Sequence, residues 1–268
     1  MTREHIFRSS WKRKLKTDEN LTQLPGVDRT FTRYDQSDNS VRYSKLEDLF
    51  SVVVKRVCAT CNNQWMNDLD SIVEPWVFDP YNDDNRCDPR EFRRWALKVA
   101  LLRIHYDEPL VIEPADPPKI FCGEDISDWH VFIGRTAIPE HRHALCGVGP
   151  HTTTGGKLFG VTQVSWTLGH SLVTALRVHG SHEWSTNCLR NFKQYNRIQN
   201  IIVREILPSA VEMPRMLSLP ALSRERVQTL VWLFTTHPTS PMAEEVRKSN
   251  EGMPELADKL GVEWGKPR

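Results

Sequence analysis

The segment Cys58-Ala59-Thr60-Cys61-Asn62-Asn63 largely decides which fold this chain predicts. The residues before it, 49–57, are mostly apolar and β-branched, which is typical of a strand. The residues after it carry apolar side chains at helical spacing, which predicts a helix over residues 62–73, ended by Glu74-Pro75. The sequence therefore predicts a strand, a turn with two cysteines and a helix in direct succession.

The predicted helix has an apolar and a polar side. Its apolar side comprises Trp65, Leu69, Ile72, Val73 and Trp76. On the other side lie Asn63, Asn67 and Asp70, which are either an ordinary solvated face or part of a polar site. Asn62 is also open to two interpretations, because Asn is a favoured N-cap residue without any further role.

A second helix is specified more strongly than any other. Asp88 is its expected N-cap, Pro89 its first residue, and Glu91 closes a capping box. Its buried stripe is expected to contain Phe92, Trp95, Val99, Leu102 and Tyr106. Further on, alternation predicts strands over 129–135 and 158–166, and either a strand or a helix over 169–178. Helices are expected over 185–206 and 227–234, the last capped by Ser223. Near the start, 8–16 predict one or two helical turns and 17–45 a loop or loose hairpin.

Composition sets limits on function. The chain has 268 residues and a formal net charge of +1, so only local clusters of charge can argue for nucleic acid. We expect neither a membrane span nor a signal peptide, because no stretch is long and apolar enough and the N-terminus has no apolar segment. Six cysteines without regular spacing argue against a secreted disulfide scaffold. These features predict a cytoplasmic protein with reduced thiols.

Two short motifs carry the candidate chemistry, and each alone is ambiguous. Most acid-His pairs such as Glu4-His5 are surface residues without a role. The Cys58-x-x-Cys61 pair fits half of a zinc site, a redox pair or two buried thiols. The redox interpretation is disfavoured because a thioredoxin-like pair needs a βαβ context and a helix that starts at the first cysteine, whereas the helix is expected after the second.

In combination, the two motifs resemble the HNH endonucleases, in a branch of bacterial and phage members. That branch has Glu-His-Ile/Val-Phe-Pro near the start and later Cys-x-x-Cys-Asn-Asn-x-Trp-Met-x-x-Leu-acid. Here the matching residues are Glu4-His5-Ile6-Phe7 and residues 58–70, followed by Trp95-Ala96-Leu97-Lys98 for the branch's Trp-Ala-x-Lys. The resemblance is specific over residues 4–70. It implies an α+β chain with a small ββα-metal (HNH-like) module over 1–78 and a mixed α+β accessory domain over 79–268.

The resemblance also implies roles for individual residues. His5 would be the general base that activates water, and Glu4 with Asn62 or Asn63 would hold one divalent cation against the scissile phosphate. Oxygen ligands favour Mg²⁺ or Mn²⁺. Cys58 and Cys61 would be half of a zinc knuckle, but family members place a second CxxC pair before the acid-His strand, where this chain has only Met1-Thr2-Arg3. A complete structural Zn²⁺ site is therefore not expected.

Local basic residues support a DNA partner. The candidates near the motifs are Arg8, Lys12, Arg13, Lys14, Lys55 and Arg56. A second group on the capped helix comprises Arg90, Arg93, Arg94, Lys98 and Arg103. An ordinary charged surface is the alternative for both groups, and Trp11 is expected to pack on the core rather than stack on a base.

The sequence thus favours a metal-dependent endonuclease that hydrolyses DNA phosphodiester bonds. The alternative is an HNH-derived module, impaired in catalysis, that binds nucleic acid or protein. A protein partner or an oligomer could complete the site.

Overall fold

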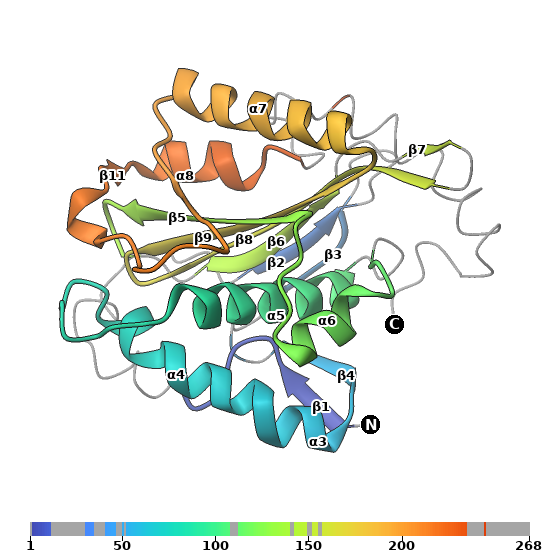
Figure 1. Ribbon diagram of the computed structural model, residues 1–268, viewed down its shortest axis with the longest axis vertical. Coiled ribbons are helices and arrows are strands. Elements are labelled where there is room, and N and C mark those ends of the chain that lie inside the picture. The colour runs from blue at the N-terminus through green and yellow to red at the C-terminus, as the bar shows by residue number, and fades with distance from the viewer. Residues whose placement is uncertain are drawn as a thin grey trace.

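The chain forms a mixed α+β structure, as expected from its sequence. The computed structural model describes residues 2–11, 30–34, 41–46, 50, 52–107, 112–139, 142–148, 152–154, 157–234 and 244. Figure 1 shows the order of the layers, with a two-stranded ribbon and a helix at one side, a central helix, a large sheet and two covering helices.

The N-terminal strand and the predicted cysteine-bearing segment lie together. Strand β1 (Thr2–His5) pairs antiparallel with β4 (Val53–Val57), within the segment expected to be a strand. The chain then turns directly into α3 (Ala59–Cys61), a π-helical turn η1 (Asn62–Met66) and α4 (Asn67–Phe78), with a kink at Gln64. The helical segment therefore begins earlier than expected, immediately after Cys58.

The end of α4 also differs from the prediction. The helix continues through Pro75 to Phe78, because the next residues, Trp76 and Val77, are buried and Trp76 packs edge-on against Phe92, with ring centroids 4.8 Å apart. This packing outweighs the hydrogen bond that the proline removes. Ile72 was expected on the apolar side, but it is 45% exposed.

Helix α5 (Pro89–Asp107) begins where the sequence predicts. The Asp88 carboxylate accepts a hydrogen bond from the Arg90 backbone N–H at 2.7 Å, which confirms the N-cap. Glu91 lies 3.9 Å from the Arg94 guanidinium. The expected stripe is buried except for Tyr106, which is partly exposed. The short α6 (Asp116–Cys122) follows and ends at Gly123, which has a left-handed φ of 74°.

The large sheet has seven strands within the described residues, in the order β10-β5-β9-β8-β6, with β11 beside β5 and β7 beside β8. Their bounds are β5 (Trp129–Thr136), β6 (Arg142–Val148), β7 (Thr152–Thr154), β8 (Lys157–Leu168), β9 (Ser171–His179), β10 (Arg204–Ile206) and β11 (Ala221–Leu222). The expected strands at β5 and β8 are confirmed, and the open choice over 169–178 is resolved as strand β9. Strand β10 occupies the end of a segment that was expected to be helical.

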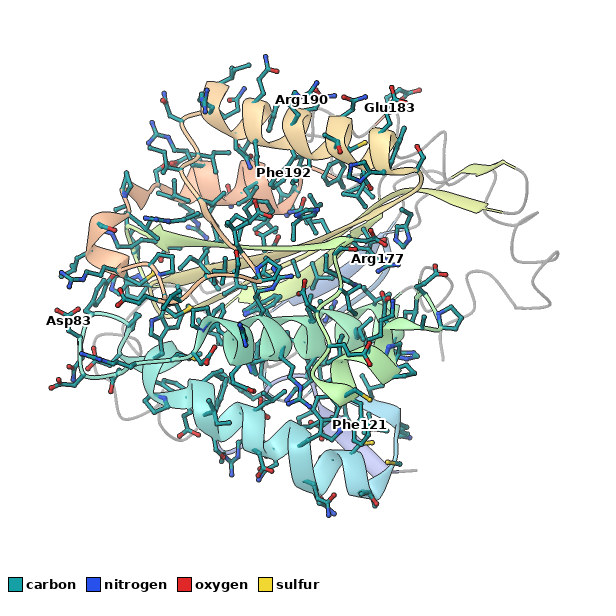
Figure 2. All side chains as sticks on the ribbon, in the orientation of Figure 1. Asp83, Phe121, Arg177, Glu183, Arg190 and Phe192 are labelled. Atoms are coloured by element: carbon teal, nitrogen blue, oxygen red, sulfur yellow. The ribbon has the colours of Figure 1, made fainter. Side chains whose placement is uncertain are left out.

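Both faces of this sheet are covered, which explains why every residue of β9 is buried. Helix α5 covers one face, and α7 (His182–Ile198) with α8 (Arg224–Val231) covers the other (Figure 1). Phe192 points from α7 toward the sheet, whereas Arg190 points outward (Figure 2). The Ser223 hydroxyl caps α8 as predicted. A short 3₁₀ turn, η3 (Met216–Ser218), precedes β11.

Strands β2 (Thr30–Tyr34) and β3 (Val41–Leu46) pair antiparallel, in agreement with the hairpin alternative for that region. Rings from three parts of the chain join the core. Phe7 lies 6.0 Å and Trp95 lies 5.8 Å from Trp166, centroid to centroid. One buried cluster therefore extends from the β1–β4 ribbon through α5 to the sheet. Among the described residues, no helix is both long and apolar enough to cross a membrane.

Candidate functional site

The β1–β4 ribbon pairs the strand that carries the acid-His motif with the strand that leads into the cysteine turn. His5 is opposite Val53 and Glu4 is opposite Val54 in the antiparallel register, with an irregularity between Thr2 and Glu4. The pairing is extended by the Ile6 backbone N–H, which donates to the Val52 carbonyl at 3.1 Å. In this register Thr2, opposite Val57, lies beside the cysteine turn, whereas the acid-His pair lies opposite Val53 and Val54, toward the other end of β4.

The His5 ring is half-buried and held by the backbone. Its Nδ1 lies 2.8 Å from the carbonyl oxygen of Phe50. A carbonyl oxygen only accepts hydrogen bonds, so Nδ1 carries the proton in this contact. In the neutral imidazole the lone pair then resides on Nε2. This arrangement fixes the tautomer and orientation that a general base requires.

Glu4 is directed into the core, toward α5. It is only 7% exposed, and its carboxylate lies 3.8 Å from the ammonium of Lys98. Because successive side chains of a strand point to opposite faces, His5 is directed away from this contact. Burial raises the pKa of Glu4 from its usual 4.5 to about 7, against the attraction of Lys98 and with a further upward contribution from Asp70.

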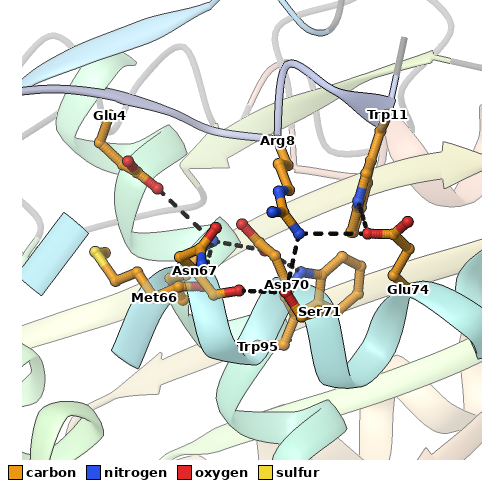
Figure 3. A network of polar contacts seen from close by, with 10 residues as sticks. Glu4, Arg8, Trp11, Met66, Asn67, Asp70, Ser71, Glu74 and Trp95 are labelled. Atoms are coloured by element: carbon orange, nitrogen blue, oxygen red, sulfur yellow. Dashed lines mark hydrogen bonds and ion pairs between the residues drawn. The ribbon is translucent and has the colours of Figure 1, made fainter. Parts of the chain in front are cut away.

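Lys98 is the centre of a buried polar network. Figure 3 shows its partners Glu4, Met66 and Asp70, with Trp95 beside Asp70. The Lys98 ammonium lies 2.7 Å from Asp70 Oδ1 and 3.5 Å from the Met66 carbonyl. The Trp95 indole N–H donates to the same Asp70 oxygen at 3.0 Å. Asp70 therefore does not belong to a solvated face, which corrects that alternative. Lys98 on α5 instead joins the Glu4 carboxylate on β1 to the Asp70 carboxylate on α4.

The two candidate asparagines have different environments. The Asn62 side-chain amide donates to the Arg3 carbonyl at 3.0 Å, which ties the start of η1 to β1 two residues before His5. Asn62 is half-buried, whereas Asn63 is exposed. Asn62 is therefore tied to β1, whereas Asn63 faces solvent.

The two cysteines form a pair of free thiols. Cys58 is exposed and Cys61 is partly exposed, and the Cys61 backbone N–H donates to Cys58 Sγ at 3.1 Å. Among the residues that the structure describes, no group of three or more His, Cys, Asp or Glu side chains is placed to hold a metal ion. Among these residues, neither the cysteine pair nor Glu4 therefore belongs to a group of three or more side chains that could hold a metal ion.

The basic residues that were predicted to contact DNA differ in their exposure to solvent. Lys55 is exposed on β4. Arg8 is one-third exposed and bonds to the Ser71 hydroxyl at 2.9 Å and to Glu74 at 3.5 Å. Arg56 belongs to β4, but its side chain lies outside the described residues, as do Lys12, Arg13 and Lys14. The Trp11 ring is fully buried against Phe78 and Trp95, so its expected packing on the core is confirmed.

The second basic group is not a phosphate-binding surface as a whole, which corrects that expectation. Arg93, Lys98 and Arg103 are at most 3% exposed. Arg93 donates to the Ile206 carbonyl at 2.8 Å and pairs with Asp125 at 2.9 Å. The physical reason is that α5 lies between the ribbon and the sheet, so many of its cations neutralise internal acceptors instead of facing solvent.

The Lys98 network was not identified as a site from the sequence, although a signal for it exists. Trp95 and Lys98 are three residues apart on a helix and therefore share a face, and Asp70 lies one residue after the buried Leu69. No protein-family model, curated protein or solved structure matches the chain. A functional proposal must therefore rest on these residues and their geometry.

Proposed function

We propose that this chain is a metal-dependent, HNH-type endonuclease that hydrolyses DNA phosphodiester bonds, with His5 as the general base. The observation that carries the proposal is the contact between His5 Nδ1 and the Phe50 carbonyl at 2.8 Å. It leaves the basic lone pair on Nε2, on a strand that Asn62 ties to the helical segment. An anchored, neutral imidazole is the group that removes a proton from an attacking water molecule.

In this proposal the chain supplies the base, and the DNA supplies the phosphodiester. Nε2 of His5 accepts a proton as the water oxygen attacks phosphorus, and the bond to the leaving 3′ oxygen breaks. That oxygen takes a proton from solvent, so the products are a 5′ phosphate and a 3′ hydroxyl group. Exposed Lys55 lies on the neighbouring strand and would contribute a phosphate contact.

The dependence on Mg²⁺ or Mn²⁺ follows from the family resemblance. The residues assigned to the cation fit it incompletely, because Glu4 is turned to Lys98 while Asn62 is tied to β1. A hard cation of this kind usually needs at least one carboxylate. The geometry of these residues therefore does not itself define a cation site.

A second function is favoured by the same observation on Glu4. If the acid of the acid-His pair is permanently engaged by Lys98, the module binds nucleic acid or a protein without cleaving. This is the catalytically impaired alternative, and it predicts DNA binding that Mg²⁺ and Mn²⁺ do not convert into cleavage.

The test is a nicking assay on supercoiled plasmid with Mg²⁺, Mn²⁺ or a chelator. Wild type should nick in the presence of a cation, and His5→Ala should lose about 10²–10⁴-fold in rate while it retains DNA binding. His182→Ala, at an exposed position on α7, is the matched control and should keep full activity.

Two results decide against the proposal. DNA binding by wild type without nicking under any cation would favour the non-cleaving module. Equal nicking by wild type and His5→Ala would show that His5 is not the base.

A further inference from the structure

Cys58 and Cys61 are neighbours at the point where β4 gives way to the helical segment. Residues three apart on a helical turn lie on the same side, and the Cys61 N–H holds Cys58 Sγ at 3.1 Å. Both thiols are free, and Cys58 is exposed to solvent. The CxxC spacing is the one at which two cysteines exchange readily between dithiol and disulfide.

The two sulfur atoms differ in their exposure. Cys58 is exposed, whereas Cys61 is partly buried and packs against the main core cluster. Cys58 is thus the sulfur that an external disulfide reaches first, and Cys61 lies behind it.

We propose that Cys58 and Cys61 form a reversible thiol–disulfide exchange site that reacts with low-molecular-weight disulfides such as glutathione disulfide. The sequence argued against this because a thioredoxin-like pair needs a βαβ context and a helix that begins at the first cysteine. The structure meets the second condition, since the helical segment begins at Ala59. It does not meet the first, since β4 pairs antiparallel with β1, so the proposed site exchanges thiols and disulfides outside a thioredoxin-like fold. This site does not depend on the nuclease proposal.

The reaction balances in two exchanges. The Cys58 thiolate attacks one sulfur of glutathione disulfide, which forms a mixed disulfide and releases one glutathione thiolate. Cys61 then loses its proton and attacks Cys58 Sγ, which forms the Cys58–Cys61 bond and releases the second glutathione. Two protein thiols are oxidised, and one external disulfide is reduced to two thiols.

Oxidation would close the turn that immediately precedes Asn62. Because Asn62 donates to the Arg3 carbonyl, this turn is the connection between the helical segment and β1. The redox state of the pair is therefore coupled to the geometry of that connection.

The experiment equilibrates the full chain with defined ratios of glutathione to glutathione disulfide. Remaining thiols are then alkylated, and disulfides are located by peptide mass spectrometry. Wild type and Cys122→Ser should both form a Cys58–Cys61 disulfide with the same midpoint; Cys122 is an exposed cysteine outside the pair. Cys61→Ser should instead accumulate glutathione on Cys58, because the second exchange then lacks its attacking thiol.

Circular dichroism on each variant verifies that it folds. The proposal is overturned if Cys58 and Cys61 remain fully alkylated at every ratio, or if oxidation joins either of them to another cysteine. It is also overturned if the isolated protein holds one zinc per chain that protects both thiols, since the pair would then be a metal site.

Discussion

Lys98 on α5 and Asp70 on α4 form an ion pair of 2.7 Å between side chains that are 0% and 4% exposed. The Glu4 carboxylate at 3.8 Å adds a second negative charge to this single cation. Three segments that carry sequence motifs therefore meet at one ammonium group. Since isolated buried charges are costly, the network is expected to fix β1, and with it His5, relative to the helices.

Replacing Lys98 by Met should destabilise the protein strongly, because Asp70 would remain buried without its cation. The expected loss in free energy of unfolding is about 3–5 kcal/mol, measured by urea denaturation with tryptophan fluorescence. The double variant Lys98→Met with Asp70→Leu removes both charges and should recover part of the loss. Full stability of the single variant would show that the pair contributes nothing to the fold.

The raised pKa of Glu4 predicts that the free energy of unfolding depends on pH. Its pKa in the folded chain is raised from 4.5 to about 7, so the folded state binds more protons than the unfolded state between these values. The stabilisation from protonated Glu4 is complete below pH 4.5 and is lost as the pH rises through about 7. The loss amounts to about 3 kcal/mol at most, from 1.36 kcal/mol per unit of pKa.

Glu4→Gln mimics the protonated acid and should remove this slope. The variant should match wild type near pH 4 and exceed its free energy of unfolding at pH 8. The same substitution at exposed Glu124 controls for the loss of a surface carboxylate. Parallel stability curves for wild type and Glu4→Gln from pH 4 to 8 would contradict the prediction.

Local signals in the sequence predicted the elements, whereas burial of the charged residues depended on tertiary packing. The Asp88 cap of α5 and the alternation in β5 are local patterns, and both were predicted correctly. Strand β10 has only three residues and is defined by pairing with β5, which no local pattern reveals. Lys98 and Arg93 looked like surface cations, because a helix sequence does not show that the helix is covered on two sides.

The candidate site, too, could be predicted from the sequence only in part. The strand before the cysteine turn was foreseen, whereas its antiparallel pairing with β1, which places His5 opposite Val53, required the fold. The sequence does not show that the Glu4 side chain points into the core. Its partner Lys98 is distant in sequence, and the position of Lys98 is known only from the fold. Asn62 and Asn63 are chemically identical neighbours, and their burial and the contact with the Arg3 carbonyl, which distinguish them, follow from the fold.

Asn62→Ala and Asn63→Ala should therefore behave differently. Asn62→Ala removes the hydrogen bond to the Arg3 carbonyl and should lower the free energy of unfolding by about 0.5–1.5 kcal/mol. Its nicking rate should fall as well, because the helical segment loses a connection to β1. Exposed Asn63 should tolerate alanine in a thermal unfolding assay. Equal effects of the two substitutions on stability and nicking would remove the basis for preferring Asn62.

The final prediction concerns DNA affinity. Lys55 is exposed on β4, beside the strand that carries His5, so Lys55→Ala should weaken binding to all DNA sequences alike. Loss of one phosphate contact should lower the slope of log affinity against log salt by about one. Arg190→Ala is the matched control, since Arg190 points outward from α7 on the opposite side of the sheet (Figure 2). Fluorescence anisotropy over a salt series measures both slopes, and an unchanged slope for Lys55→Ala, or an equal drop for Arg190→Ala, would place the DNA elsewhere on the protein.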